Sequence, residues 1–298
     1  MNLNASSISL HLCDLNHRIK VMVFHIINIT KTFYSIFFIY LTIMLSLAIE
    51  TKAMEIKSIA STSLCGDTFI LELAPKHISH LSWQSRSPLS TANEKQKKLP
   101  QVWNDTETLI NSGASHILFG PGETNNNVLP TVQKIELKWG EGFETIRSNA
   151  ELIIKSLELE GDILDNWEER IKSLQRKVET REIKPKVLYL SRSGSSAGSN
   201  TFVDEAIKSA GGLNVVKQTG WYKPDAEQLI KYTPDLIITS YFDNGYDSVE
   251  AVAIRNKVIK RFIYSHPVVE IEGGLWPCAG PGLIKAAEKI SIALDSLP

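Results

Sequence analysis

The sequence is poor in the residues that most often mark metal sites. Its 298 residues include three cysteines and seven histidines, and none of these belongs to a C-x-x-C pair, an H-E-x-x-H motif or a histidine-rich cluster. Those patterns are the common signatures of structural zinc and of metalloprotease sites. A structural zinc site is therefore not expected.

The sequence also lacks an excess of charge of either sign. The 32 Lys and Arg residues nearly balance the 33 Asp and Glu residues, which leaves a formal net charge of −1. Nucleic-acid binding usually needs a basic face, so we expect no nucleic-acid partner. A hydrophobic content of 43% in 298 residues is typical of a globular protein with one large core or two ordinary ones.

One long uncharged run stands out near the N-terminus. Residues 32–49, TFYSIFFIYLTIMLSLAI, follow Lys31 and resemble the apolar region of a secretory signal. The 18-residue run is also close to the lower length limit for a membrane span. Small residues fit cleavage after Ala48 or Ala53. We expect residues 1–53 to be a cleaved signal peptide, with an uncleaved membrane anchor as the alternative.

Two cysteines remain after such a cleavage. Cys13 leaves with the signal, whereas Cys65 and Cys278 stay in a chain that is exported to an oxidising compartment. Both lie near the N-termini of predicted helices, where a thiolate is stabilised and could contact a metal or a ligand. A disulfide, a metal or ligand contact, and a pair of inert thiols are all compatible with the sequence.

Two segments repeat at a constant offset of 120 residues. DTETLINSGASHILFG begins at Asp105 and DAEQLIKYTPDLIITS begins at Asp225. Each predicts a short helix with an Asp near its N-terminus, followed by a buried strand. KSIAS and KVLYLS, each followed by a polar loop and a helical pattern, form a looser second repeat, and Gly211-Gly212 is expected to end the later helix. Repeated strand–helix alternation indicates two similar α/β lobes with parallel sheets.

A long amphipathic helix is predicted between the lobes. Its apolar stripe has spacings of 4, 4, 3 and 4 residues and consists of Ile163, Trp167, Ile171, Leu174 and Val178. We expect a helix of about 20 residues, ended by Pro185. The predicted organisation is an N-terminal lobe at 54–156, a connecting helix at 157–184 and a C-terminal lobe at 185–298.

The order and spacing of these segments resemble the class III periplasmic solute-binding proteins of ABC importers, which capture vitamin B12, haem and iron–siderophore complexes. The resemblance covers about residues 55–296 and also rests on SIASTSLCGDTFILELAP, GSNTFVDEAIKSAGGLNVV and LWPCAGPGLIKAAEKI. It implies an α/β protein with two Rossmann-like lobes, each with a central parallel sheet, joined by one long α-helix. The ligand cleft then lies between the lobes, at the C-terminal ends of the strands.

This resemblance implies a periplasmic, monomeric, non-enzymatic carrier that delivers its cargo to an ABC permease in the inner membrane. The protein then needs no cofactor of its own, because the metal belongs to the bound chelate. Among ligands the sequence favours a cobalamin-type corrinoid, followed by an iron–siderophore or haem. A membrane-anchored ligand sensor or adaptor with the same fold is the alternative.

The resemblance also assigns a role to two acidic residues. In proteins of this family, one surface glutamate on each lobe docks onto arginines of the permease. The matching positions in this sequence are Glu107 and Glu227. They are equivalent in the internal repeat, which suits a two-fold permease. The alternative is that these first-turn acids only complement helix dipoles.

Candidate ligand contacts lie in the loops that follow predicted strands. A large flat ligand is bound best by aromatic faces and a few polar groups in a concave site. The aromatic candidates could instead be core residues, and the two arginines could be surface charges rather than partners for ligand carboxylates or phosphates. The candidates are Trp83, Arg86, Phe119, Glu123, Arg192, Ser193, Trp221, Phe242 and Trp276.

The sequence GSSAG at residues 194–198 matches the G-x-S-x-G pattern of a serine hydrolase. Ser196 could then act with Asp235 or Asp243 and His266. However, a nucleophile elbow places its serine directly at the strand end and begins a helix at once, whereas this helical pattern begins only near Thr201. Hydrolysis is the weakest alternative, and no enzyme activity is expected.

Overall fold

The computed structural model describes residues 33–42, 57–123, 130–240 and 256–298. The chain divides into two compact units, Met1–Glu55 and Ile56–Pro298. In the first unit, residues 33–42 form a helix whose side chains are exposed. Among the described residues, no helix combines the length and the apolar character needed to cross a membrane. The expected cleavage sites after Ala48 and Ala53 lie outside the described residues.

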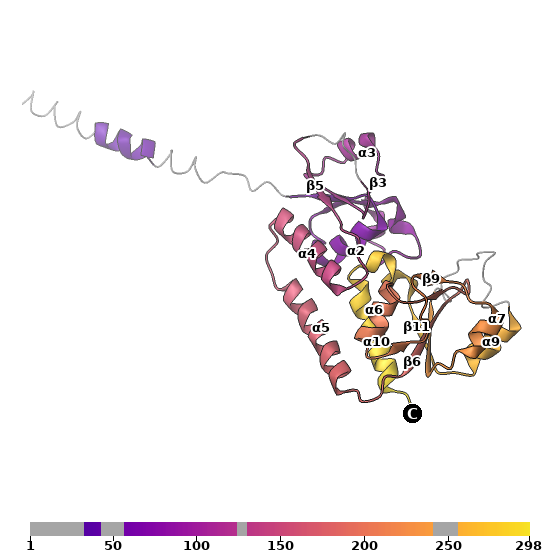
Figure 1. Ribbon diagram of the computed structural model, residues 1–298. Helices are drawn as coiled ribbons and strands as arrows, with labels where there is room; N and C mark the ends of the chain where they lie inside the picture. Colours follow the sequence, from indigo (N-terminus) through magenta and orange to yellow (C-terminus); the bar gives the residue numbers. More distant parts are fainter. Residues whose placement is uncertain (1–32, 43–56, 124–129, 241–255) are drawn as a thin grey trace, which may run out of the picture. The chain divides into compact units, whose positions relative to one another are not determined.

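The second unit begins with an α/β lobe on a five-stranded parallel sheet, drawn in purple to magenta in Figure 1. The strand order is β3-β2-β1-β4-β5. The strands are β1 (Ile59–Ser61), β2 (Ile78–Ser82), β3 (Gln101–Val102), β4 (His116–Phe119) and β5 (Gln133–Glu136). The helices are α2 (Leu64–Leu73), α3 (Thr106–Asn111) and α4 (Phe143–Leu157), with short 3₁₀ helices η1 (Trp83–Arg86) and η2 (Gln96–Lys98).

The second lobe, drawn in orange to yellow, is built on a four-stranded parallel sheet of order β11-β10-β6-β8. Its strands are β6 (Lys186–Ser191), β8 (Leu213–Asn214), β10 (Leu236–Ser240) and β11 (Val268–Ile271). A small antiparallel ribbon pairs β7 (Ser196–Ala197) with β9 (Trp221–Tyr222). The helices are α6 (Phe202–Ser209), α7 (Ala226–Lys231), α9 (Lys257–Tyr264) and α10 (Gly282–Asp295), and the 3₁₀ helices are η3 (Gly273–Leu275) and η4 (Pro277–Ala279).

The internal repeat predicted from the sequence is confirmed. Asp105 caps α3 by accepting a hydrogen bond from the Thr108 amide at 2.9 Å, and Asp225 caps α7 by accepting one from the Gln228 amide at 2.7 Å. Each helix leads to a fully buried strand, β4 or β10, which lies beside the first strand of its sheet, β1 or β6. Gly211, with φ +87°, follows the end of α6 as expected.

The connecting helix is α5 (Ile163–Thr180), which has 18 residues and ends five residues before Pro185. The predicted stripe faces inward, because Trp167 and Leu174 are buried. Sequence analysis did not identify the preceding helix α4, although its apolar residues recur at spacings of 3, 4, 3 and 4. These residues are Phe143, Ile146, Ala150, Ile153 and Leu157.

Ion pairs join α5 to a helix of each lobe. Arg147 of α4 contacts Glu168 of α5 at 3.0 Å. Arg170 of α5 donates two hydrogen bonds, each of 2.7 Å, to the carboxylate of Glu288 in α10. A planar guanidinium that binds both carboxylate oxygens fixes geometry better than a single contact. This bonding supports the prediction that α5 acts as a rigid strut.

Candidate functional site

The strands of each main sheet are parallel, so all their C-terminal ends meet at one edge of that sheet. Ligands of open α/β sheets bind beyond this edge. We call the loops that follow the C-terminal ends of the strands in the two sheets the ligand edge. Eight of the nine sequence-derived candidates lie in the described residues, and Phe242 lies outside them.

Trp83 is the first residue of η1 and directly follows β2, with its side chain 52% exposed. The helix is held by Ser82, whose hydroxyl accepts a hydrogen bond from the Gln84 amide, and by Gln84, whose side chain accepts one from the Leu64 amide at 3.1 Å. Arg86 is exposed, and its Nε donates to the Lys97 carbonyl at 3.1 Å. Trp83 therefore offers a ring surface at the ligand edge, whereas Arg86 partly serves to fold its own loop.

A carboxyl that sequence analysis did not identify supports this loop. Asp67 in the first turn of α2 is fully buried and accepts hydrogen bonds from the amide and hydroxyl of Ser82 at 3.0 and 2.6 Å. Burial raises the pKa of the Asp67 carboxyl to about 6, and the hydrogen bonds from Ser82 oppose that shift. An acid among the apolar residues of a predicted helix was the signal that could have identified it.

Phe119 was expected to contact the ligand, and the structure corrects this. It is the last residue of β4, has no exposed surface and packs in the apolar cluster of the N-terminal lobe. A ring with no exposed surface cannot contact a ligand in this conformation. Glu123 lies at the edge, but its Oε2 accepts hydrogen bonds from Thr62 Oγ1 at 2.5 Å and the Gly120 amide at 2.9 Å, which close the turn after β4.

Arg192 and Ser193 begin the loop after β6 and are half-buried. The Arg192 amide donates to the Ser240 carbonyl at 3.1 Å, which ties this loop to the end of β10. The Ser193 hydroxyl lies 2.9 Å from that of Ser191 and 3.1 Å from that of Ser195. These three hydroxyls form a polar cluster at the ligand edge of the second sheet.

The structure contradicts the hydrolase interpretation of Ser196. This residue lies in β7, has no exposed surface, and its hydroxyl donates to the Tyr189 carbonyl at 2.6 Å. The next helix, α6, begins only at Phe202. Neither the exposure of a nucleophile nor the immediate strand-to-helix turn of an elbow is present.

Trp221 and Trp276 have different surroundings although both belong to one aromatic cluster. Trp221 of β9 is 54% exposed, whereas Trp276 has no exposed surface and donates from Nε1 to Ser240 Oγ at 2.8 Å. Both indoles contact Tyr189 and Phe202, with ring centroids 5.3 to 6.3 Å apart. Trp221 therefore stays a candidate ligand contact. Trp276 was also expected to contact the ligand, but it is a buried core residue of the cluster that includes Trp221.

Two further tryptophans at the ligand edge were missed by sequence analysis. Trp103 directly follows β3 and is 47% exposed, and Trp139 follows β5 by three residues and is 76% exposed. Trp139 lies over Gly122, because a Cβ at that glycine would come within 3.1 Å of the indole nitrogen. Two residues further on, the Glu141 carboxylate accepts a hydrogen bond from the Phe202 amide at 3.0 Å. The sequence signal was weak, because neither tryptophan follows an apolar run: LPQV precedes Trp103 and QKIELK precedes Trp139.

Cys65 and Cys278 form a disulfide, with Cα atoms 5.4 Å apart. Cys65 lies in the first turn of α2, and Cys278 lies in η4, just before α10. Bonded sulfurs are no longer thiolates, so the bridge excludes the metal contact that the sequence left open. In the described part of the chain no group of three or more His, Cys, Asp or Glu residues is arranged to hold a metal ion.

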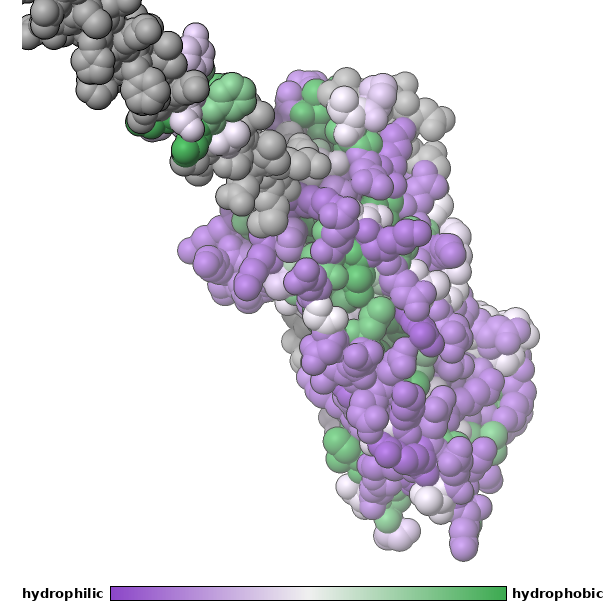
Figure 2. All heavy atoms as spheres, turned by 90° about the vertical axis from the view of Figure 1, so that its left-hand side faces the viewer, coloured by the Kyte–Doolittle hydropathy of each residue, from purple (hydrophilic) through white to green (hydrophobic). Residues whose placement is uncertain are grey.

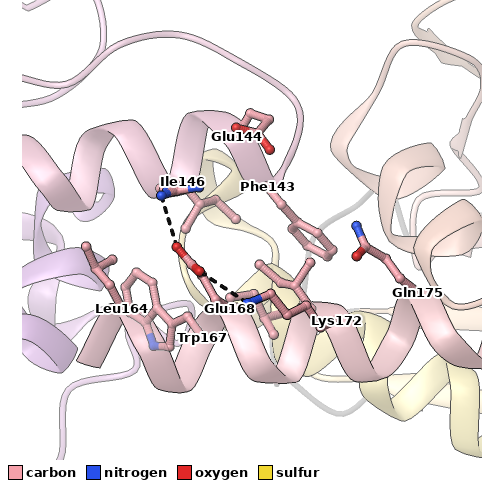
Figure 3. Close-up of a pocket in the computed structure, with 11 residues that line it drawn as sticks. Phe143, Glu144, Ile146, Leu164, Trp167, Glu168, Lys172 and Gln175 are labelled. Atoms are coloured by element: carbon pink, nitrogen blue, oxygen red, sulfur yellow. Dashed lines mark ion pairs between the residues drawn. The ribbon is translucent and has the colours of Figure 1, made fainter. Parts of the chain in front are cut away.

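A cavity of about 150 Å³ lies away from the ligand edge, between α4 and α5. Figure 3 shows Phe143, Leu164 and Trp167 at its walls, with Glu168 beside Lys172 of α5. Glu168 also contacts Arg147 of α4. Figure 2, turned so that the side with α4 and α5 faces the viewer, shows hydrophobic atoms within a mainly hydrophilic surface. The walls of this cavity are mainly the apolar residues through which α5 packs on α4. We therefore interpret it as a gap in the packing of the two helices rather than as a ligand site.

Glu107 and Glu227 occupy equivalent places in the two lobes. Each is exposed in the first turn of its helix, α3 or α7, and follows the capping aspartate by two residues. The structure therefore places one exposed carboxylate on each lobe, as the repeat predicts.

Comparison with known proteins identifies the fold. No protein-family model and no curated protein matches the chain. The periplasmic haem-binding protein HutB of Vibrio cholerae superimposes with a TM-score of 0.64 at 18% identity, over 80% of this chain and 99% of HutB. A periplasmic haem-binding protein of Pseudomonas aeruginosa gives 0.62 at 17% identity, over 81% and 94% of the chains. Staphylococcus aureus IsdE complexed with haem gives 0.58 at 15%, over 80% and 98%. The chain has the two-lobed fold of class III solute-binding proteins, which confirms the predicted fold class.

Proposed function

We propose that this chain, whose fold is that of periplasmic haem-binding proteins, is the substrate-binding component of an ABC importer for a metal chelate. The proposal rests chiefly on one observation: the ligand edge carries partly exposed tryptophans in a fold that the compared proteins use to bind haem. Binding is non-catalytic, and the chelate is cargo rather than a cofactor. The protein acts in the periplasm as a monomer.

Haem replaces the corrinoid as the favoured ligand. The three proteins compared above are described as haem-binding or as complexed with haem, and a related fold from Helicobacter pylori, CeuE, has bound Ni(II). None of these four is described as a corrinoid binder. A ferric siderophore comes next and cobalamin last.

Polar groups at the ligand edge suit the carboxylates of such a ligand. Arg192 and Ser193 follow β6, and Arg86 lies three residues after Trp83 on the other lobe. A guanidinium binds a carboxylate through two parallel hydrogen bonds. Trp83 and Trp221 supply ring faces for the apolar part of the ligand.

Titration of the purified protein with haemin, a ferric siderophore and cobalamin tests this function. We expect saturable quenching of tryptophan fluorescence, with haemin binding most tightly, because several indoles lie at the proposed site. Quenching by none of the three at ligand concentrations up to tens of micromolar, roughly −6 kcal/mol of binding free energy, would refute the proposal.

A membrane-anchored sensor is the second candidate, favoured by the exposed apolar side chains of the helix at residues 33–42. Mass-spectrometric mapping of the N-terminus separates the two candidates. A carrier that diffuses in the periplasm begins after Ala48 or Ala53, whereas an anchored sensor retains residues 32–49.

A further inference from the structure

The loop after β5 carries Trp139 and is fixed to helix α4 on both sides of that residue. Asn149 of α4, which is buried, accepts a hydrogen bond from the Lys138 amide at 2.8 Å and donates one to the Lys138 carbonyl at 3.1 Å. On the other side of Trp139, a Cβ at Gly140 would lie 1.8 Å from Thr145 Oγ1, so the close approach of the loop to α4 requires glycine. The exposed indole of Trp139 is therefore presented by a loop with a defined position.

The same loop reaches the C-terminal lobe through Glu141. Its carboxylate accepts the hydrogen bond of 3.0 Å from the amide of Phe202, the first residue of α6. Amides in the first turn of a helix have no partner within the helix and lie at the positive end of its dipole, so a carboxylate is a favourable acceptor for them. Hydrogen bonds to a charged group are also stronger than those between neutral groups. Glu141 therefore bonds the N-terminal lobe to α6.

Helix α6 returns this contact through Glu205 in its own first turn. Glu205 lies beside Gly142, the N-cap of α4, because a Cβ at that glycine would be 3.5 Å from the carboxyl carbon of Glu205. Glycine has no side chain with which to cap α4, and a carboxylate from the other lobe lies near the positive end of that helix instead. Each lobe thus places a glutamate at the start of a helix of the other lobe.

Phe202 connects this contact to the exposed tryptophan of the C-terminal lobe. Its ring lies edge-on to that of Trp221, with centroids 5.3 Å apart. Thr201 fixes the start of α6, because its hydroxyl accepts a hydrogen bond from the Asp204 amide at 3.2 Å. A continuous chain of contacts therefore runs from one exposed indole on the N-terminal lobe, through Glu141 and Phe202, to another on the C-terminal lobe.

We infer that Glu141 is a positioning residue whose hydrogen bond to α6 sets the spacing of Trp139 and Trp221, so that one ligand contacts both indoles. This inference rests on the proposed function and refines it. Glu141 acts through the two tryptophans rather than by contacting the ligand. Two indoles that are already held at the right spacing need not be ordered when the ligand binds, and the saved entropy increases the affinity.

Haemin titration of the full-length protein and of three single variants tests the inference. Glu141→Ala should weaken haemin binding about fivefold, because the two indoles are then no longer held before the ligand binds. Glu141→Gln should bind haemin within about twofold of the unmodified protein, since its side-chain oxygen can still accept from the Phe202 amide. Glu144→Ala is the matched control and should leave binding unchanged, because Glu144 is an exposed acid in the first turn of α4.

Two further measurements distinguish positioning from a general effect on structure. Hydrogen exchange resolved to single amides needs no ligand, and the Phe202 amide should exchange about tenfold faster in Glu141→Ala than in the unmodified protein. A double-mutant cycle with Trp139→Ala tests the connection to the indole. If Glu141 acts by placing Trp139, then Glu141→Ala should weaken haemin binding by less than about twofold once that indole is absent.

Each outcome supports or overturns a stated claim. Glu141→Ala that binds haemin as tightly as the unmodified protein, or Glu141→Gln that binds as weakly as Glu141→Ala, overturns the inference and leaves the proposed function standing. An unchanged exchange rate at Phe202, or strict additivity in the double-mutant cycle, overturns it as well. If the unmodified protein binds none of haemin, a ferric siderophore and cobalamin, the proposed function itself is refuted. Circular dichroism of each variant shows whether a loss of binding reflects unfolding.

Discussion

At the scale of single residues, one buried carboxyl holds the loop that presents Trp83. Asp67 accepts hydrogen bonds from the amide and the hydroxyl of Ser82, and Ser82 caps the N-terminus of η1. Burial raises its pKa to about 6 from an ordinary value of 3.8. Between about pH 4 and pH 6 the folded chain therefore holds a proton at Asp67 that the unfolded chain has lost. Across this window the contribution of Asp67 to stability falls as the pH rises.

Asp67→Asn isolates this effect. The amide keeps an acceptor for the Ser82 amide and cannot ionise, so the variant should lose the pH dependence that comes from Asp67. We expect the unfolding free energy of the unmodified protein, minus that of the variant, to fall by about 2 to 3 kcal/mol between pH 4 and pH 7. Urea denaturation at pH 4, 5, 6 and 7 measures this difference. A difference that stays constant with pH would show that Asp67 titrates normally.

Single residues also show where sequence analysis stops. Loop position selected Trp83 and Trp221 together with Phe119 and Trp276, and only the first two are exposed. Trp276 is covered by Tyr189 and Phe202, which lie more than 70 residues away in the chain. The burial of a ring in a loop is decided by distant elements that pack on it, and local sequence does not contain that information.

At the scale of secondary-structure elements, the sequence is a better guide. Offset repeats and the 4-4-3-4 stripe predicted α3, α7 and α5, because capping and amphipathic periodicity are local properties. The end of α5 was predicted too late, since Pro185 only limits how far a helix can extend. Helix α4 was missed although its spacing is equally regular. The disulfide could not be chosen over the alternatives, because only the folded chain brings Cys65 and Cys278 together.

The paired helices α3 and α7 carry the proposed docking residues, Glu107 and Glu227. Replacing both with Ala should reduce ligand uptake by cells at least about tenfold, because truncating a charge that is paired across an interface commonly costs 2 to 5 kcal/mol. Haemin binding by the purified variant should not change, since both glutamates are exposed first-turn residues of helices and do not belong to the loops that carry the proposed ligand contacts. Uptake assays in cells that produce the importer, together with fluorescence titration, measure the two effects.

Glu144→Ala is the control for the docking variant. Glu144 is also an exposed first-turn acid, on α4, and it lies outside the repeat. Its loss should remove only a dipole interaction of about 0.3 to 1 kcal/mol. If the double variant loses ligand binding, or if uptake falls equally in the control, then the docking assignment is wrong.

At the scale of the second unit, the disulfide and α5 connect the lobes at separate places. Cys65 of α2 belongs to the N-terminal lobe, and Cys278 precedes α10, which packs on the C-terminal lobe. Beside this bridge, Lys285 of α10 contacts Glu72 of α2 at 2.5 Å. Helix α5 is bonded to α4 and α10. Because both connections cross between the lobes, we expect only a small hinge movement when ligand binds.

The bridge closes a loop of more than 200 residues, from Cys65 to Cys278. Constraining so long a loop lowers the conformational entropy of the unfolded chain, so removing the bridge should reduce the unfolding free energy by about 2 to 5 kcal/mol. The double variant Cys65→Ser with Cys278→Ser should therefore unfold at a lower denaturant concentration than the oxidised protein. Reductant should lower the midpoint of the unmodified protein and leave that of the variant unchanged. Alkylation and intact-mass measurement of the exported protein checks the premise. A protein that alkylates at both cysteines without reduction, or that is as stable without the bridge, would show that the lobes are held by packing and by α5 alone.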